Sequence, residues 1–154
     1  MIRITRQTDY GILLLSHMAT HLPSEVHTAK DVAKASKISL PMVSKTLKAL
    51  ARAGLVVSQR GVKGGYRLSK QASRISIGDV IEALEGPIGI TECSFNPGAC
   101  EQEGHCPVQA NWKRISVAVR DALERIPISD LSRPQMTQPD LHFIDLPPQN
   151  LRPL

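Results

Sequence analysis

The chain has 154 residues, 42% of them hydrophobic, and carries a formal net charge of +5. This length suits one compact domain with an accessory element, or two small domains, and the composition excludes a disordered protein. The sequence has no apolar run near the roughly 20 residues that a membrane helix needs, and its first residues lack a secretory signal. We therefore expect a cytoplasmic protein with no membrane partner.

The charge is distributed unevenly along the chain. Residues 1–74 contain thirteen Lys or Arg against three Asp or Glu, whereas residues 75–154 contain six against eleven. A strongly cationic half indicates a polyanionic partner such as nucleic acid, and the anionic half must have another role. We therefore expect a DNA-binding domain over 1–74, a second functional segment over 75–131, and a tail over 132–154 whose prolines predict flexibility.

Two helices are predicted at the start of the first half. One spans about residues 8–20, and its spacing places on one face Ile12, Leu13, Leu15, Met18 and Ala19. Thr28 and Asp31 then form the pattern of a capping box, in which each side chain can satisfy the backbone N–H of the other residue. The second helix is expected to continue to about Ser36.

A third helix is predicted from about Leu40 to Ala53, capped at its start by Ser39 and stopped by Gly54. Its inward face would carry Val43, Leu47 and Leu50. A short helix, a tight turn and a second helix with a cationic outer face form the helix-turn-helix that enters a major groove. The candidate DNA contacts on this pair, with base edges read early in the helix and phosphates contacted later, are Thr28, Pro41, Met42, Ser44, Lys45, Lys48 and Arg52.

Residues 55–68 predict a β-hairpin of two short strands joined by the glycine-rich turn 61–65. Such a hairpin after a helix-turn-helix is a wing. Its cations Arg60, Lys63 and Arg67 would lie at or near the tip, suited to the negative potential of a narrow minor groove. A nucleotide-phosphate loop is disfavoured, because no Gly-Lys-Ser/Thr or Gly-x-Gly-x-x-Gly pattern stands before a helix there. We expect a double-stranded DNA operator as partner and no small-molecule substrate.

Two helices are predicted in the second half. The first begins at Ser76 and runs to about Glu85. The second opens at Pro107 and repeats apolar residues at intervals of four and three, as in the seam of a coiled coil, through Val108, Trp112, Ile115, Val119, Ala122 and Ile126. Packing of this helix on its own domain stays open as an alternative. A homodimer is favoured because paired subunits can read two half-sites on DNA.

The three cysteines of the chain lie between these two helices, as Cys93, Cys100 and Cys106. Their C-x6-C-x5-C spacing lacks the close ligand pairs of structural zinc sites and suits the several iron corners of an iron–sulfur cluster. A zinc site, metal-free redox switching and ordinary exposed thiols are the alternatives. Three thiolates leave a fourth position open, for which the candidates are His105, Glu101, Glu103, Gln109 and Asp9.

Several segments resemble one bacterial family, the regulators typified by IscR and NsrR. The similar segments are RITRQTDY at 3–10, ARAGLV at 51–56, RGVKGGYRL at 60–68, DVIEALEG at 79–86 and the three-cysteine loop. The resemblance covers about residues 1–131, and it is closest to regulators of SUF-type iron–sulfur cluster assembly, given TEC at 91–93 and CPVQANW at 106–112. It implies a homodimeric transcription factor that holds an iron–sulfur cluster through the three cysteines.

The fold class expected from the residues and from this resemblance is mainly α with a small β wing. It consists of a winged helix-turn-helix domain followed by a cluster-binding loop and a long dimerisation helix. The resemblance also bears on the fourth ligand. IscR-type members complete the cluster with a histidine three residues after the last cysteine, where this chain has Gln109.

NsrR-type members use an aspartate near the N-terminus of the partner subunit, and Asp9 stands at that place. Asp9 is therefore the favoured fourth ligand and His105 the second choice, with a [2Fe–2S] cluster favoured over [4Fe–4S]. The alternative role of Asp9 is that of an ordinary acid in the first turn of a helix.

The sequence therefore predicts a repressor that senses iron–sulfur cluster status and controls SUF-type cluster assembly genes. A nitric-oxide-sensing repressor of the same fold is the alternative. An iron–sulfur electron carrier is the alternative from another class, although it would not need the cationic first half. No enzyme is expected, because the sequence has no Gly-x-Ser-x-Gly or His-Glu-x-x-His motif.

Overall fold

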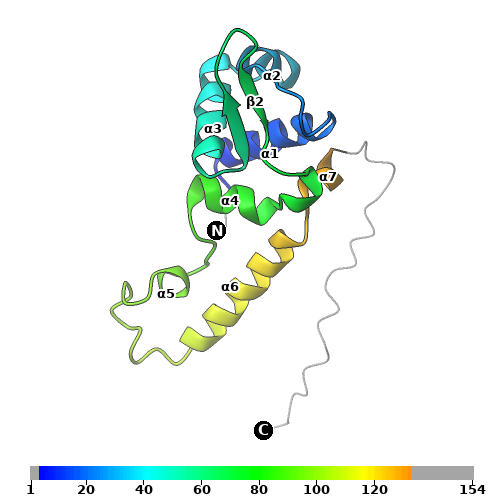
Figure 1. Ribbon diagram of the computed structural model, residues 1–154. Coiled ribbons are helices and arrows are strands. Elements are labelled where there is room, and N and C mark those ends of the chain that lie inside the picture. Colours follow the sequence, from blue (N-terminus) through cyan, green and yellow to red (C-terminus); the bar gives the residue numbers. More distant parts are fainter. Residues whose placement is uncertain (1–3, 133–154) are drawn as a thin grey trace.

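The computed structural model describes residues 4–132, which form a helical unit with one small sheet and a projecting arm (Figure 1). The elements are, in chain order, α1 (Arg6–Ala19), α2 (Ala29–Ser36), α3 (Leu40–Arg52), β1 (Val56–Gln59), β2 (Gly65–Leu68), the 3-10 helix η1 (Ala72–Arg74), α4 (Ile77–Glu85), α5 (Glu92–Phe95), α6 (Gln109–Glu124) and α7 (Ile128–Leu131). The predicted fold class is confirmed. The predicted tail lies outside the described residues, apart from Ser132. No described helix is both long and apolar enough to span a membrane.

The hydrophobic core lies where α1, α3 and α4 meet the base of the antiparallel β1–β2 hairpin. Its buried members are Leu14, Leu15, Met18, Val32, Val43, Leu47, Leu50, Leu55, Val56, Leu68, Ile75, Ile77, Val80 and Ile128. Burying a large apolar side chain of this kind stabilises the fold by roughly 1.5–3 kcal/mol. The core continues past residue 74, since α4 and α7 contribute to it. The division at residue 74 therefore stays a prediction about function.

Helix α1 packs on α3 and α4 with a face that differs from the predicted one. Its buried apolar positions follow the i, i+3, i+4, i+7 spacing of a helix face: Gly11, Leu14, Leu15 and Met18. The prediction that Leu13 shares this face is wrong, because its side chain is 47% exposed. Three successive leucines leave the spacing ambiguous. Gly11 lies on the buried side against α4, where a Cβ would lie 2.5 Å from the end of the Leu84 side chain.

Helices α2 and α3 form the predicted helix-turn-helix. Thr28 caps α2 by accepting the Asp31 backbone N–H at 3.1 Å, but its hydroxyl donates to the Asp31 carboxylate at 2.6 Å. A side-chain pair therefore replaces the second half of the predicted capping box. Ser39 is the N-cap of α3 without a side-chain cap bond, and Pro41 in the first turn has no N–H to offer. Gly54 follows the helix with a φ of +76°, as the predicted stop requires.

Helices α5 and α6 form an arm that projects from the core (Figure 1). Helix α6 begins at Gln109 rather than at the predicted Pro107, and it ends before Ile126 of the predicted seam. The chain then returns to the core, where the Ile77 N–H donates to the Ile126 carbonyl at 2.9 Å. The arm is thus joined to the core at both ends, by α4 before it and by α7 after it. Helix α5, which contains Cys93, is not among the elements that the sequence predicts.

Candidate functional site

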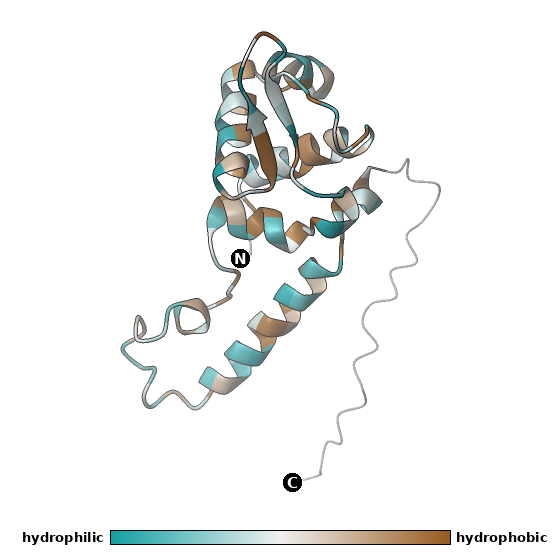
Figure 2. Ribbon diagram, in the orientation of Figure 1, coloured by the Kyte–Doolittle hydropathy of each residue, from teal (hydrophilic) through white to brown (hydrophobic). Residues whose placement is uncertain are grey.

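The outer face of α3 is cationic, while its inner face is packed. The predicted inner residues are all fully buried, namely Val43, Leu47 and Leu50. Three predicted DNA contacts are exposed on the other side, namely Lys45, Lys48 and Arg52. Figure 2 shows the resulting alternation of hydrophobic and hydrophilic segments along α3. A basic helix face of this kind can follow a phosphate backbone and reach into a major groove.

The other predicted contacts of the helix-turn-helix lie at the starts of its two helices. Pro41 is exposed in the first turn of α3, and Met42 and Ser44 are half-buried beside it. Thr28 is exposed at the start of α2, but its hydroxyl is bonded to Asp31. Thr28 is therefore the least available of these candidates for a side-chain contact with DNA.

The wing places two of its three predicted cations in the turn between β1 and β2. Arg60 and Lys63 are both exposed there. A Cβ on Gly64 would lie 2.5 Å from the Gln59 carbonyl oxygen, so the turn requires glycine. Arg67 instead lies within β2, half-buried, and its Nη1 donates to a backbone carbonyl at 3.4 Å. Only the first two cations are therefore positioned at the tip.

The three cysteines lie at the outer part of the arm. Cys93 is buried in α5, Cys100 and Cys106 are half-buried in the loop between α5 and α6, and all three thiols are free. The Thr91 hydroxyl lies 3.3 Å from the Cys93 sulfur. Within residues 4–132 the three sulfur atoms are not gathered closely enough to share one metal ion. Free thiols are the donors that an iron–sulfur cluster requires, and here one lies in α5 and two lie in the loop after it.

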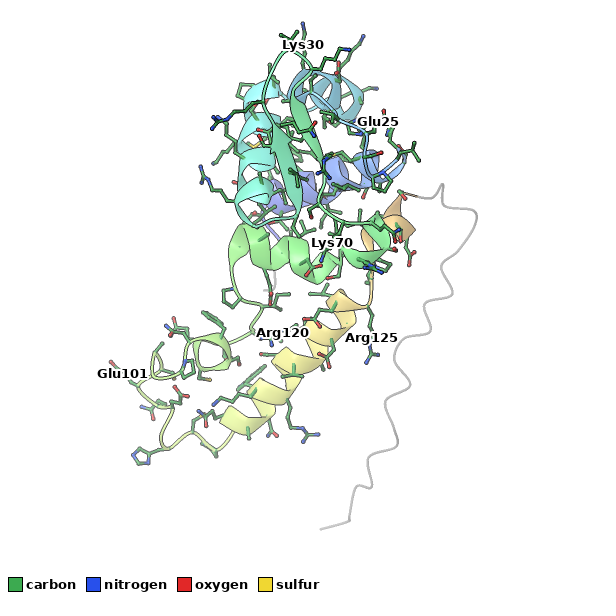
Figure 3. All side chains as sticks on the ribbon, viewed as in Figure 1. Glu25, Lys30, Lys70, Glu101, Arg120 and Arg125 are labelled. Atoms are coloured by element: carbon green, nitrogen blue, oxygen red, sulfur yellow. The ribbon has the colours of Figure 1, made fainter. Side chains whose placement is uncertain are left out.

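Glu103 fastens the cysteine loop to α6. One of its carboxylate oxygens accepts the Gly98 N–H, and the other accepts the Gln109 side-chain N–H at 2.8 Å. The Lys113 Nζ atom lies 3.6 Å from that second oxygen. Two candidates for the fourth ligand, Glu103 and Gln109, are thus bonded to each other. The remaining candidates in the loop are exposed, namely Glu101 (Figure 3) and His105.

Arg120 connects α6 to α4 and to the segment between α4 and α5 (Figure 3). Its Nη2 donates to the Ile88 carbonyl at 3.2 Å, and its Nε lies 3.7 Å from a carboxylate oxygen of Glu82, an ion pair longer than a hydrogen bond. One turn earlier, the buried Ser116 hydroxyl accepts the Ile90 backbone N–H at 3.1 Å. These contacts define the side of α6 that faces its own chain.

Four residues of the predicted seam are exposed, with fractions of 46% for Val108, 38% for Trp112, 44% for Ile115 and 42% for Ile126. Val119 and Ala122 are half-buried, and α6 packs on α4 and α5 of its own chain, so packing on its own domain stays an alternative. A row of large apolar side chains left in water is typical of a surface that a partner covers.

Asp9 lies exposed in the first turn of α1. Helix α1 packs against α2, α3, α4 and α7, whereas α5 packs against α6, so Asp9 and the cysteines of one chain belong to different parts of the structure (Figure 1). At the start of α1, the Thr5 N–H donates to Glu85 at the end of α4, at 2.8 Å. Burial raises the pKa of Glu85, but hydrogen bonds from Thr8 and Thr5 outweigh this effect and hold the pKa below its ordinary value.

Comparison with known proteins places this winged-helix chain among transcriptional regulators. The chain matches the model of the Rrf2 family, described as an iron-dependent transcriptional regulator, over residues 4–134. It is 31% identical to the HTH-type transcriptional regulator IscR of Vibrio cholerae over 130 residues, 84% of this chain and 75% of that protein. It is 30% identical to protein rrf2 of Nitratidesulfovibrio vulgaris over 132 residues, 86% of this chain and 88% of that protein.

Among solved structures, CymR, the global cysteine regulator of B. subtilis, is similar with a TM-score of 0.67 and 30% identity. The similarity covers 86% of this chain and 97% of that one. The predicted resemblance to IscR-type regulators is confirmed, and the named homologues are transcriptional regulators rather than enzymes.

Proposed function

Because the chain belongs to the Rrf2 family of transcriptional regulators, we propose that it regulates transcription according to whether an iron–sulfur cluster is bound at Cys93, Cys100 and Cys106. The observation that carries the proposal is a set of three free thiols, one buried in α5 and two half-buried in the loop after it, in a chain related to IscR. The proposed targets are SUF-type iron–sulfur cluster assembly genes, and the proposed direction is repression. DNA-binding regulation itself follows from family membership.

The winged helix is the part that binds DNA, and we assign its contacts as follows. The first turn of α3 and Lys45 face base edges in the major groove, while Lys48 and Arg52 contact phosphates. Arg60 and Lys63 enter the adjacent minor groove from the tip of the wing. The exposure of these five cations supports the assignment.

The open stripe on α6 is proposed to pack against the same stripe of a second copy. A two-fold interface uses one surface twice, so four large apolar side chains of one chain would cover four of the other. Such a dimer presents two α3 helices to two half-sites about one helical turn apart. The side of α6 that bears Ser116 and Arg120 contacts its own chain, so it is not available to a second copy.

Three coordination positions of the cluster are assigned to the cysteines and the fourth to Asp9 of the partner subunit. Asp9 is exposed, and within one chain it lies apart from the cysteine loop, so a cross-subunit role suits its position. When bound, the cluster supplies a group that is sensitive to iron supply and to oxidants. His105, exposed beside Cys106, is the second choice for the fourth position.

Loss of the cluster would change the position of α3 through a series of contacts that are present in the structure. Arg120 ties α6 to α4 through Glu82, and Glu85 at the end of α4 holds the start of α1 at Thr5. Helix α1 packs directly on α3. DNA and cluster would then bias one conformational equilibrium, which is allosteric coupling, typically of about 1–3 kcal/mol.

Replacing Lys48 by alanine tests the DNA-binding surface. Each lost phosphate contact should reduce the slope of log affinity against log salt concentration by about 1, and should weaken binding to operator and unrelated DNA alike. Fluorescence anisotropy with labelled duplexes at several salt concentrations measures both effects. The control is Arg114→Ala, which removes an exposed charge from the arm and should leave the slope unchanged. Equal slopes for Lys48→Ala and the parent chain would show that Lys48 makes no contact with a phosphate.

Replacing Glu103 by glutamine should make the cluster labile without removing a ligand. The change weakens the link to Lys113, and a glutamine has only one acceptor oxygen for the N–H groups of Gly98 and Gln109, so one of these hydrogen bonds is lost. The loop should therefore separate from α6 more easily. We expect a cluster half-life shorter by severalfold, followed by absorbance after exposure to air. Glu101→Gln removes the same charge from an exposed position of the same loop and should behave as the parent chain. Equal half-lives in all three chains would show that Glu103 does not anchor the loop.

The similarity to CymR supports a second candidate, in which the thiols respond directly without a cluster. That function requires protein that stays free of iron and sulfide after anaerobic reconstitution, and whose DNA affinity changes when the thiols are oxidised.

A further inference from the structure

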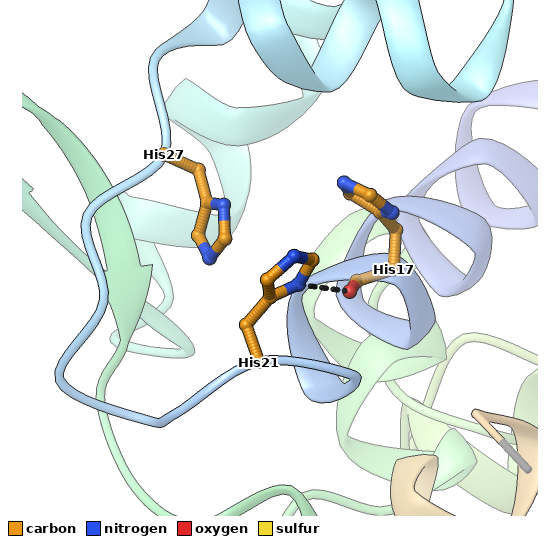
Figure 4. Close-up of side chains that lie close together, drawn as sticks. All are labelled: His17, His21 and His27. Carbon is orange, nitrogen blue, oxygen red and sulfur yellow. Dashed lines mark hydrogen bonds between the residues drawn. The ribbon is translucent and has the colours of Figure 1, made fainter.

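Three histidines lie together at the end of α1, outside the surfaces assigned above (Figure 4). His17 belongs to the last turn of α1, His21 follows the helix, and His27 precedes the N-cap of α2. The three side chains each offer one ring nitrogen, and these nitrogens lie within 4.8 Å of one another. The sequence gives no sign of this cluster, because the chain must turn back after α1 before His27 can meet the other two.

The hydrogen bonds around His21 leave its outer ring nitrogen free. The Thr20 hydroxyl donates to the His17 carbonyl at 2.7 Å, so it can only accept from His21 Nδ1, 3.0 Å away. The same Nδ1 lies 3.2 Å from the His17 carbonyl, which can only accept. Nδ1 therefore carries the proton, and Nε2 of the neutral ring keeps its lone pair. Metal-bound histidines are oriented in this way, by a hydrogen bond from the ring nitrogen that does not bind the metal.

The surroundings favour neutral rings at the two inner positions. Burial lowers the pKa of His17 below its ordinary value of 6.5, and the neighbouring His21 lowers it further. Burial also lowers the pKa of His27, with His21 adding to the effect and Glu25 opposing it. A neutral imidazole is the form that binds a metal ion, so both shifts are in the direction that favours metal binding at His17 and His27.

His27 is bonded to the wing and adjoins the helix-turn-helix. Its backbone N–H and carbonyl pair with the carbonyl and N–H of Tyr66 in β2, each at 2.8 Å. Gly65 permits this approach, because a Cβ there would overlap the His27 carbonyl. Thr28, the N-cap of α2, is the next residue. A metal bond to the His27 side chain would therefore restrict the movement of both the wing and the start of α2.

We propose that His17, His21 and His27 form a site for a divalent transition metal of the Zn²⁺ class, separate from the cysteine loop. Three imidazoles with a fourth position left to water suit Zn²⁺, whose bonds to nitrogen are about 2.0–2.1 Å long. A tetrahedral site needs nitrogens about 3.4 Å apart, so the three rings must come closer together than the 4.8 Å that they now span. The ion would clamp the end of α1 to the segment that begins α2 and to the wing, and so stabilise the DNA-binding unit.

The test is calorimetric titration of the full-length chain with zinc chloride, in a background where Cys93, Cys100 and Cys106 are replaced by serine. This background prevents zinc from binding to the thiols. We expect one Zn²⁺ ion per chain. The zinc affinity of His21→Gln and of His27→Gln should be at least about tenfold lower than that of the background chain, because loss of a group that only hydrogen-bonds a metal ligand already lowers metal affinity by about that factor. His105→Gln should bind as the background chain does. Zinc should also raise the thermal unfolding midpoint of the background chain but not that of His21→Gln.

Equal zinc affinity in the background chain and in His21→Gln overturns the proposal. Binding that is lost in His21→Gln but kept in His27→Gln also overturns it, because it reports a chelate of two surface histidines. His21 is exposed, so its replacement leaves the fold intact. If circular dichroism shows that His27→Gln is unfolded, His17→Gln takes its place, and the same results decide.

Discussion

Replacing Ile115 by glutamate is expected to convert the protein into a monomer and to weaken binding to operator DNA by about a hundredfold or more. Ile115 belongs to the open apolar stripe of α6, with 44% of its side chain exposed. In the proposed two-fold interface each new carboxylate would face the apolar stripe of the other copy. An unpaired charge there costs several kcal/mol, and each 1.4 kcal/mol is a factor of ten. Analytical ultracentrifugation and fluorescence anisotropy measure the two effects.

Val117 provides a matched control for this substitution. It lies on the same helix, on the side turned away from the stripe, and is 49% exposed. Val117→Glu therefore introduces the same charge in place of a similar β-branched side chain, yet it should leave both the dimer and the DNA affinity unchanged. If Ile115→Glu and Val117→Glu are equally dimeric, the stripe is not the subunit interface. A parent chain that is itself monomeric contradicts the proposed dimer directly.

Replacing Cys106 by serine is expected to remove the cluster, and with it any difference in DNA affinity between anaerobic and air-exposed protein. The thiol is free and half-buried, so a hydroxyl fits its space and the fold should persist. A serine hydroxyl is a harder and poorer ligand for an iron–sulfur cluster than a thiolate. Cluster occupancy should fall by about tenfold or more. Iron and sulfide analysis, with the visible absorption spectrum, measures the loss.

Two further variants distinguish Asp9 from His105 as the fourth ligand of the cluster. Asp9→Ala should leave DNA binding by the cluster-free chain intact while the cluster is released faster. His105→Gln should have the cluster lifetime of the parent chain, although it is the neighbour of Cys106. If His105→Gln releases the cluster faster and Asp9→Ala does not, His105 is the fourth ligand instead. Parent-like cluster content in Cys106→Ser would remove that thiol from the ligand set.

Much of the fold is predictable because its signals are local. The N-cap at Thr28, the stop at Gly54 and the glycine-rich turn of the wing each act within a few residues, and the structure has all three. The errors lie where packing decides. Leu13 and Leu14 cannot be distinguished by periodicity inside a run of leucines, and the packing of α1 in the fold buries Leu14 and leaves Leu13 exposed. Helix α5 spans only Glu92–Phe95, too short to show a period.

The candidate ligands of the site can be named from the residue types, but their contacts cannot. Three thiols and no close ligand pair point to an iron–sulfur cluster from the sequence alone. The anchoring of the loop by Glu103 and of α6 by Arg120 depends on partners that the fold brings together, so neither has a motif. Arg67 is expected at or near the wing tip, and it lies half-buried within β2, where its packing cannot be predicted from the sequence.

Cluster-dependent regulation is tested most directly by measuring the DNA affinity of one anaerobic sample before and after its cluster is removed. Iron and acid-labile sulfide should be present in equal amounts, about two of each per chain for the [2Fe–2S] form. Removal should change the affinity for operator DNA by about 5- to 150-fold, the usual range of allosteric coupling. Protein that stays colourless and iron-free after anaerobic reconstitution, or equal affinity with and without the cluster, would contradict it.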